Sequence, residues 1–507
     1  MSTIIIVITV VAYMLFMVGV GVVLSRKNTS THDFYLGGRQ LGPFVTAMSA
    51  EASDMSSYLL MGVPGVALAG LVGMNGSFAE ALWTVLGLSV GTYINWLLVA
   101  KRLRIYSEKV DAHTIPDFFA NRFGQGAEII LIMAAVIIII FFVPYTASGF
   151  ASVGKLFNSL FGWNYHTAMI VGAVIIAAYT ALGGFLAAST TDFIQSIIMT
   201  FALVIVLFYG ISVGDGVDGI IRSTNDVPNY FSLTGPDGNF GIITIISTIS
   251  WGLGYFGMPH ILLRFMAIKD DKKLKLSRRI ASVWVIIAMT VAVFIGVLGY
   301  AFVTNHNLIS IKGFDPERII IYIADTLSHI NPFFAVVAGL IISGILASIM
   351  STSDSQMLAA ASSVSENIIK RGISKDIDDK KQMLIARLTV LIITVIGVCF
   401  AWNQNSSVFR IVSFAWAGFG ASFGPLMLFS LFWRRLNKWG AFAGIVSGAG
   451  MIFIWKFGIA KLGGIFAIYE LMPAFLTSCL AIIIVSLLTK KPDEEVVEIF
   501  DEVKNLM

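Results

Sequence analysis

The sequence predicts an all-α polytopic membrane protein with about thirteen transmembrane helices. Of its 507 residues, 57% are hydrophobic and only 13% are charged, whereas about a quarter of the residues in a soluble domain are charged. Apolar runs long enough to cross about 30 Å of hydrocarbon recur along the whole chain. Ten of these runs divide into two groups of five with opposite topology, which indicates a five-plus-five inverted repeat.

The apolar runs define the expected helices in chain order. The first run, residues 4–24, is followed by Arg26 and Lys27 and has no small-residue cleavage site. We therefore interpret it as a retained helix and not as a signal peptide. The other spans are expected at 43–72, 78–100, 127–157, 166–183, 189–212, 241–267, 280–304, 330–368, 385–402, 407–432, 439–457 and 467–489.

Lysine and arginine in the loops predict the orientation. Basic loops at 25–40, 101–122, 269–279, 370–387 (with Lys375) and 434–438 alternate with polar or acidic loops at 213–240 (with Asp237) and 305–325. Basic loops stay in the cytoplasm, so the N-terminus is expected outside the cell and the C-terminus in the cytoplasm. The net charge of +4 mostly reflects these loops. This charge does not suggest nucleic-acid binding. Membrane lipid is expected around the helices, and no obligate protein partner is predicted.

These expectations divide the chain into six segments. They are the first helix with a cytoplasmic loop (1–42), the first repeat of five helices (43–212), an extracellular loop (213–240), the second repeat of five helices (241–432), two additional helices (433–489) and a charged, amphipathic cytoplasmic tail (490–507).

The first span of each repeat is interrupted. Residues 49–65 read "SAEASDMSSYLLMGVPG" and residues 246–260 read "ISTISWGLGYFGMPH". A broken helix leaves N–H and C=O groups that hydrocarbon cannot satisfy. Such segments at matching places indicate a transporter binding site, where free N–H groups suit a carboxylate and free carbonyls suit sodium. The alternative is that the glycines only let helices pack closely.

Asp54 is the sharpest single indication of function. A carboxylate in the bilayer core is costly unless it is paired or faces a cavity. Sodium attraction, cation binding, proton relay and a structural hydrogen bond to the helix break all remain open from the residues alone. Glu51 lies three residues earlier, so in an intact helix both acids share a face, where they would repel each other or share a cation.

Two further groups of residues indicate a binding site. In "SIMSTSDSQ", residues 348–356, the hydroxyls of Ser351 and Thr352 are adjacent and Asp354 follows. Hard cations bind hydroxyl and carbonyl oxygens, although such hydroxyls often only bond the carbonyl one turn back. Tyr145, Trp251 and Tyr255 lie in interrupted segments, where they are either cavity walls or ordinary core aromatics.

Other function classes lack their motifs. The two cysteines, Cys399 and Cys479, lie in apolar runs, so neither a disulfide framework nor a Cys/His metal site is expected. There is no Walker phosphate loop, no channel selectivity filter, and no HExxH or GxSxG motif. The sequence therefore predicts neither ATP-driven transport nor an enzyme.

Over nearly its full length the chain resembles the bacterial sodium/proline symporters of the solute:sodium symporter family. The resemblance rests on stretches such as "YLGGRQLGPFVTAMSAEASDMSSYLLMGVPG", "YTALGGFLAASTTDFIQ", "SWGLGYFGMPHILLRFMA" and "SGILASIMSTSDSQMLAAASS". It implies a LeuT-type fold with one extra N-terminal and two extra C-terminal helices.

The resemblance also implies residue roles. One coupling Na⁺ is expected on the backbone carbonyls of Ala52, Met55 and Ser348 and the hydroxyls of Ser351 and Thr352. Asp54 is implied to be essential for sodium-dependent function, and Asp192 is linked to the ion pathway on the cytoplasmic side. The substrate is expected near Ser56, Tyr58, Tyr145, Trp251, Tyr255 and Pro259. Arg39 and Glu80 match family positions without a defined role.

The expected function is sodium-coupled import of L-proline by alternating access. Three residues depart from the family pattern, in which a small residue, a tryptophan and a glutamine stand where this chain has Glu51, Tyr58 and Met258. The alternative within the class is a sodium symporter for pantothenate, a monocarboxylate or another amino acid. A membrane sensor would carry a long soluble domain, and a channel would lack stoichiometric sodium coupling.

Overall fold

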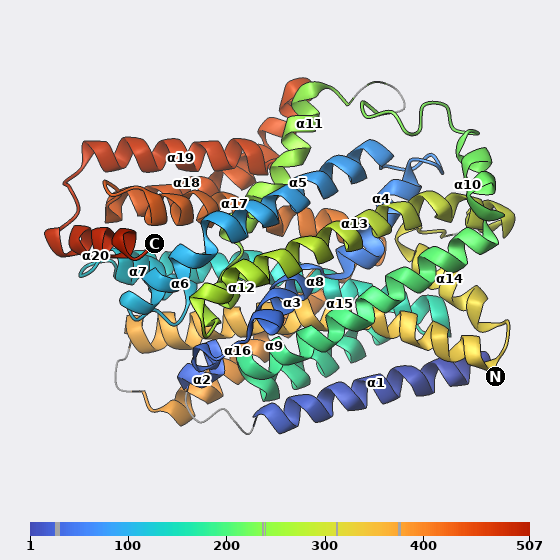
Figure 1. The fold of residues 1–507 in the computed structure, drawn as a ribbon, viewed down its shortest axis with the longest axis horizontal. Helices are drawn as coiled ribbons and strands as arrows, with labels where there is room; N and C mark the ends of the chain where they lie inside the picture. The colour runs from blue at the N-terminus through green and yellow to red at the C-terminus, as the bar shows by residue number, and fades with distance from the viewer. Residues whose placement is uncertain (26–30, 236–237, 239, 311–312, 374–376) are drawn as a thin grey trace.

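The computed structural model is all-α in the residues that it describes, which are 1–25, 31–235, 238, 240–310, 313–373 and 377–507 (Figure 1). Extended backbone pairs in this part of the chain only at the isolated bridge between Leu41 and Ile268. The predicted all-α class is therefore confirmed. Among the charges used for orientation, Arg26, Lys27, Asp237 and Lys375 lie outside the described residues.

Ten long helices form the bundle. They are α1 (Ser2–Ser25), α5 (Phe78–Leu98), α8 (Glu128–Phe161), α9 (Tyr165–Val213), α13 (Leu274–Asn305), α15 (Pro332–Ser362), α16 (Asp379–Phe400), α17 (Val408–Phe432), α18 (Lys438–Phe457) and α19 (Leu471–Leu488). Shorter helices cap the ends of the bundle: α2 (Thr31–Leu36), α6 (Ala100–Lys109), α7 (Ile115–Arg122), α10 (Gly216–Thr224), α14 (Ile319–Ser328) and α20 (Glu494–Asn505).

Two spans are divided into pieces. The first consists of α3 (Pro43–Asp54), the π-helical turn η2 (Tyr58–Gly62) and α4 (Val63–Ala69). The second consists of α11 (Ile242–Ile249), the 3₁₀ segment η3 (Ser250–Gly257) and α12 (Pro259–Ala267). Both interruptions lie where the sequence predicts them.

Length and apolarity identify ten membrane-spanning helices in the described residues, or eleven if the bent pair at 242–267 is one span. The other two predicted spans are too short for this criterion, because one is divided at α3 and the other is the helix Tyr165–Ala181. The count of thirteen therefore stays a prediction.

Predicted spans 166–183 and 189–212 belong to the single element α9. Gly184 interrupts it with φ 73° and ψ 176°. Only glycine adopts this backbone conformation without steric cost, so the two predicted helices follow one another with a local break instead of a loop.

The predicted loops contain more helix than expected. The basic segment 101–122 is mostly α6 and α7, and the polar segment 305–325 includes the start of α14. The basic side chains there pack: the guanidinium of Arg102 lies 4.9 Å from the ring centroid of Phe432 and 5.2 Å from that of Phe500. Aromatic contacts of this kind stabilise arginine at a half-buried surface.

The centre of the bundle is built on α3. It packs against α9, α12, α13 and α15, and α15 packs in turn on α8 and α9. The broken span η3 lies against α5 and α17. A Cβ added at Gly91 of α5 would overlap the backbone of Gly252, so these elements meet backbone to backbone.

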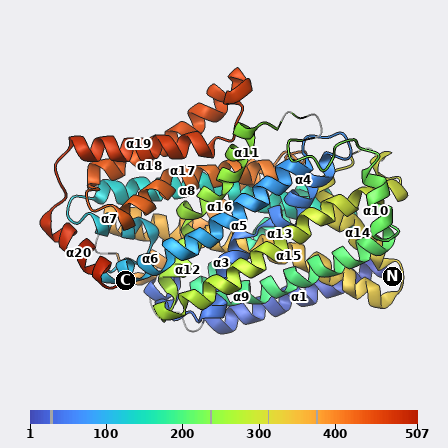
Figure 2. The same ribbon diagram turned by 45° about the horizontal axis from the view of Figure 1, so that its top comes forward.

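The two termini lie at opposite ends of the bundle (Figure 1). The N-terminus shares one end with α10 and α14, and the C-terminus shares the other end with α6, α7 and α20. The same separation is visible after rotation (Figure 2).

Candidate functional site

The first broken helix unwinds through polar residues. α3 ends at Asp54, and Met55 leaves the helical region with φ −75° and ψ 64°. The Ser56 amide donates to the Asp54 carbonyl over 2.8 Å, and the Ser56 hydroxyl accepts from the Tyr58 amide over 3.3 Å. Short local bonds thus replace the helical ladder at the point where the polar residues predict a break.

The second broken helix is interrupted by glycine and proline. η3 follows α11, Met258 is extended with φ −79° and ψ 107°, and α12 restarts at Pro259. The axis bends by 47° between 242–257 and 259–267. Proline lacks the N–H needed to continue a helix and forces the residue before it out of the helical region, which explains the position of the bend.

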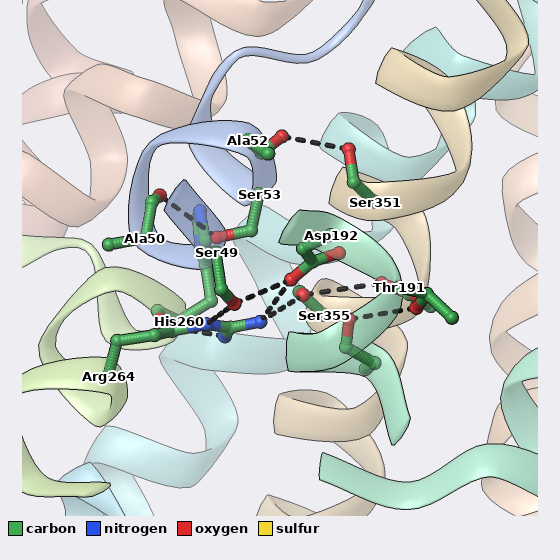
Figure 3. Close-up of polar contacts among 12 residues, drawn as sticks. Ser49, Ala50, Ala52, Ser53, Thr191, Asp192, His260, Arg264, Ser351 and Ser355 are labelled. Atoms are coloured by element: carbon green, nitrogen blue, oxygen red, sulfur yellow. Dashed lines mark hydrogen bonds and ion pairs between the residues drawn. The ribbon is translucent and has the colours of Figure 1, made fainter. Parts of the chain in front are cut away.

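Four of the five predicted sodium ligands lie together between α3 and α15. The Ser351 hydroxyl donates to the Ala52 carbonyl over 2.8 Å (Figure 3) and lies 3.3 Å from the Ser348 carbonyl. The Thr352 hydroxyl donates to the same Ser348 carbonyl over 3.1 Å. Met55, the fifth, follows the end of α3, where its amide donates to the Glu51 carbonyl over 2.8 Å.

Asp54 joins the first broken helix to the predicted substrate residues. The Tyr255 hydroxyl donates to its carboxylate over 2.6 Å, and the Tyr145 hydroxyl donates to its backbone carbonyl over 3.3 Å. Tyr58 lies in the same cluster, with its hydroxyl 3.4 Å from the Met55 sulfur. Residues from three separate spans therefore meet at Asp54.

Trp251 belongs to an aromatic stack that the sequence does not reveal. Its ring centroid lies 5.1 Å from that of Tyr469 and 5.2 Å from that of Phe409. Its carbonyl accepts from the Trp416 indole over 2.7 Å. Phe409 and Trp416 belong to α17, and Tyr469 lies just before α19. All three are far from Trp251 in the chain, and no local pattern distinguishes them from other core aromatics.

Asp192 lies beside α3 but not among the predicted sodium ligands. It pairs with Arg264 of α12 over 3.0 Å and accepts from the Ser49 hydroxyl over 2.7 Å (Figure 3). Arg264 also donates to Ser49 over 3.0 Å and to Ser355 over 2.6 Å. One ion pair therefore holds α3, α9, α12 and α15 together.

Sequence reasoning missed Arg264, although an indication was present. It is a lone arginine in the apolar run 259–267, and intramembrane charges mark functional or pairing positions by default. Arg39 and Glu80 lie outside this centre. Arg39 donates to the Met266 carbonyl over 2.6 Å and to the Ala112 carbonyl over 2.8 Å, and Glu80 binds Arg410 through both oxygens.

The predicted site is enclosed by protein. The twelve side chains predicted besides Pro259 are 0–4% exposed, and Pro259 is buried as well. A cavity of about 530 Å³ lies elsewhere, beside α4 and the buried ion pair of Lys155 with Glu317 (2.7 Å). The enclosed cluster combines carboxylate, hydroxyl, carbonyl and aromatic groups, which suits the binding of a small amphipathic solute and a hard cation.

Comparisons with known proteins agree with a site for a small solute and a cation. The sodium:solute symporter family matches residues 34–448. The chain is 42% identical to the osmoregulated proline transporter OpuE of Bacillus subtilis, over 99% of this chain and 98% of that protein. It is 41% identical to the high-affinity proline transporter PutP of the same organism, over 96% and 99% of the two chains.

A solved structure shares the fold. A Na⁺-coupled sialic acid symporter in a substrate-bound, outward-open state aligns with a TM-score of 0.78 at 17% identity, over 97% of this chain and 99% of that one. At this identity the likeness shows the fold alone. It confirms the LeuT-type architecture expected from the sequence.

Proposed function

The chain belongs to the sodium:solute symporter family, and on this premise we propose that it imports L-proline together with Na⁺ by alternating access. As a member, it is a sodium-coupled transporter of the bacterial plasma membrane and not an enzyme. Proline as the substrate is supported by two relatives, each over 40% identical across nearly the whole chain, that are named proline transporters.

The ion site of this proposal lies between α3 and α15. The observation that supports it best is the 2.8 Å hydrogen bond from Ser351 to the Ala52 carbonyl, because it aligns oxygen ligands from the two helices at the break. We assign Na⁺ to the carbonyls of Ala52, Met55 and Ser348 and the hydroxyls of Ser351 and Thr352. Five oxygens suit a hard monovalent cation.

The substrate site of this proposal lies on the other side of the break. Its residues are Ser56, Tyr58, Tyr145, Trp251, Tyr255 and Pro259. Proline has a compact apolar ring, which suits an aromatic wall, and its carboxylate suits free N–H groups where a broken helix restarts. Asp54 connects the two sites, because its carboxylate holds Tyr255 while its backbone continues from the ion-binding turn.

Coupling follows from the shared helix break. Sodium bound between α3 and α15 holds the break in the shape that accepts proline, and each ligand thereby raises the affinity for the other. Only different affinities of the outward- and inward-facing states can drive the cycle. Asp192, which accepts a hydrogen bond from Ser49 of α3, lies on the proposed route by which sodium leaves. The opposite positions of the termini in Figure 1 support an external N-terminus and a cytoplasmic C-terminus.

Uptake into proteoliposomes tests the function. Purified protein should accumulate radiolabelled proline saturably when sodium is imposed inward, and potassium should not replace sodium. Unlabelled proline should compete far better than pantothenate or a short monocarboxylate. Absence of sodium-dependent proline uptake would contradict the proposal, and non-saturable flux without fixed coupling would indicate a channel.

Replacing Thr352 tests the assigned ion site. Thr352→Ala removes one oxygen ligand. Polar interactions with a charged group contribute about 1.5–3 kcal/mol, taking hydrogen bonds to charges as the measure. The sodium concentration for half-maximal uptake should therefore rise about tenfold or more. Thr180→Ala is the matched control, since the buried Thr180 hydroxyl also donates one turn back, to the Ile176 carbonyl. An unchanged sodium requirement in Thr352→Ala would remove this residue from the site.

A further inference from the structure

Glu51 is a buried carboxylate that the proposed sodium site does not use. It lies in the last turn of α3 and is 0% exposed. One of its oxygens accepts from the Trp96 indole over 2.8 Å and from the Thr92 hydroxyl over 3.0 Å. The other oxygen, Oε2, is buried without a hydrogen-bond partner among the described residues. A buried polar oxygen without a hydrogen-bond partner is costly, so its position calls for a ligand.

Asp54 presents a second unpartnered oxygen on the same side of the helix. Residues three apart on a helix are neighbours, with Cβ atoms about 5–6 Å apart. Oδ2 of Asp54 accepts from Tyr255, whereas Oδ1 is buried and without a partner in the described part of the chain. All donors to the two carboxylates are neutral, so hydrogen bonds alone do not balance their charge.

In the described part of the chain, neither Glu51 nor Asp54 forms an ion pair; the hydrogen-bond donors to their carboxylates are Thr92, Trp96 and Tyr255. Four carboxyl groups of the bundle centre are 0–1% exposed, namely those of Glu51, Asp54, Asp192 and Asp354. Arg264 forms an ion pair with Asp192. Arg264 is already engaged by Asp192, Ser49, Ser355 and the His260 carbonyl. The C-terminal end of α3 adds about half a negative charge from the helix dipole. Every hydrogen bond that the carboxylates of Glu51 and Asp54 accept in the described residues comes from an uncharged side chain, and their second oxygens remain open to a ligand.

Asn95 of α5 provides a third side-chain oxygen near the two acids. Asn95 is 0% exposed, and its side-chain oxygen is buried without a partner among the described residues. Its amide nitrogen donates to the Tyr255 carbonyl over 3.1 Å, which holds the side chain next to the residue that binds Asp54. Asn95 follows Thr92 by three positions, so both lie on the face of α5 that meets Glu51.

The two sides of the α3 break are distinct. Ala52 directs its carbonyl to Ser351 of α15, whereas Glu51 directs its carboxylate to Thr92 and Trp96 of α5. A cation on the α5 side therefore has its own ligands, which do not compete with the ligands between α3 and α15. Carboxylate and amide oxygens are the donors that a hard cation prefers.

We propose that Glu51, Asp54 and Asn95 form a second sodium site on the α5 side of the break, so that two Na⁺ ions accompany each substrate. The inference rests on the proposed symport function but concerns its stoichiometry. The second ion neutralises the carboxylate pair and links α3 to α5, as the first ion links α3 to α15. Glu51 is the residue that distinguishes the second site, since the proposed site between α3 and α15 does not use it.

Counting bound sodium tests the site without any assumption about the substrate. Equilibrium binding of ²²Na⁺ to purified protein should give two ions per chain, and Glu51→Gln should give one. Glutamine keeps an oxygen for the Trp96 and Thr92 bonds while it removes the charge. Glu80→Gln is the control, because Glu80 pairs with Arg410 away from the break, and it should still bind two. One ion in the wild-type chain would overturn the proposal.

Accumulation measures the same stoichiometry during transport. With a tenfold inward sodium gradient and the membrane potential held at zero, two coupled ions sustain about hundredfold proline accumulation and one ion about tenfold. The wild type should reach the higher plateau and Glu51→Gln the lower one. For two coupled ions, the wild-type accumulation ratio should vary with the square of the sodium gradient. If it instead varied with the pH gradient, Glu51 would carry a proton, and the proposal would be overturned.

A second variant guards against misfolding. Asn95→Ala should weaken the second binding event in the ²²Na⁺ isotherm about tenfold and leave the first unchanged, and thermal unfolding in detergent verifies the fold of each variant. If both variants fold and bind sodium like the wild type, the second site is wrong. Failure of proline uptake with two bound ions would instead contradict the proposed substrate and leave the second site standing.

Discussion

The two broken helices of this protein occupy matching positions in the two repeats but are interrupted by different chemistry. The break after α3 is polar: two carboxylates precede it, and Ser56 bonds the freed backbone locally. The break between η3 and α12 is made by glycine and proline and surrounded by aromatic rings, among them Trp251 and Tyr469. No carboxylate lies in its described segment, 242–267.

This difference in chemistry suits the two breaks to different ligands. Oxygen-rich backbone with uncompensated negative charge suits cations, whereas a flexible glycine segment lets large rings approach and shape an apolar wall. The two breaks meet through two polar contacts, Tyr255 with Asp54 and Arg264 with Ser49. Three substitutions test this division of tasks.

The first substitution breaks the ion pair that joins the two repeats. Arg264→Gln leaves Asp192 buried without its positive partner, and loss of one member of a buried pair costs about 3–5 kcal/mol. The apparent melting temperature in detergent should fall strongly, and transport should be lost. Arg410→Gln is the matched control, because Arg410 is 52% exposed and exposed pairs contribute about 0.2–1 kcal/mol. Equal losses in both variants would contradict a central role for Arg264.

The second substitution separates the two breaks without removing a charge. Tyr255→Phe deletes the hydroxyl that donates to the Asp54 carboxylate over 2.6 Å. A hydrogen bond to a charged group contributes about 1.5–3 kcal/mol, so the apparent KM for sodium-dependent uptake should rise about 10- to 100-fold.

Tyr469→Phe serves as its control. The Tyr469 hydroxyl donates to a neutral group, the Ser413 carbonyl, over 2.8 Å, and its loss costs about 1 kcal/mol. A larger KM change in Tyr469→Phe than in Tyr255→Phe would show that the contact between the breaks is not the sensitive one.

The third substitution tests whether the second break needs its glycines for packing. A Cβ at Gly254 would overlap the indole of Trp416, and overpacking of this kind costs about 1–3 kcal/mol. Gly254→Ala should lower the melting temperature in detergent. Gly450→Ala should not, because no atom beyond its chain neighbours and the backbone of its own helix lies within 4 Å of its added Cβ. Equal stability of the two variants would mean that Trp416 moves away at little cost.

Local patterns in the sequence predict much of the fold. Long apolar runs predict α1, α5, α8 and α13 within a few residues, and Gly, Pro and polar clusters predict both broken spans. The helical content of 101–122 was missed, because charged side chains there indicate a loop until their aromatic partners are known. The helix count stays open, because the apolar helices Tyr58–Ala69 and Tyr165–Ala181 are too short to satisfy a length criterion.

The sequence predicts some residues of the candidate site and misses others, again because only local patterns are visible in it. Asp54 and the Ser351–Thr352 pair are anomalous in an apolar helix, so sequence alone identifies them, since burying such groups is costly without a purpose. Asn95, Trp96 and Trp416 are ordinary residues in their own helices. They acquire a role only because the packing of α5 and α17 brings them to the breaks.

The sequence by itself determined the membrane class, the two interrupted helices and the polar residues within them, because each follows from hydrogen bonding and hydration along a local stretch. Tertiary structure alone decided which charges are balanced. Asp192 finds Arg264, seventy-two positions away in the chain, whereas Glu51 and Asp54 find only neutral donors. Charge compensation depends on distances between helices, and no local pattern encodes those distances.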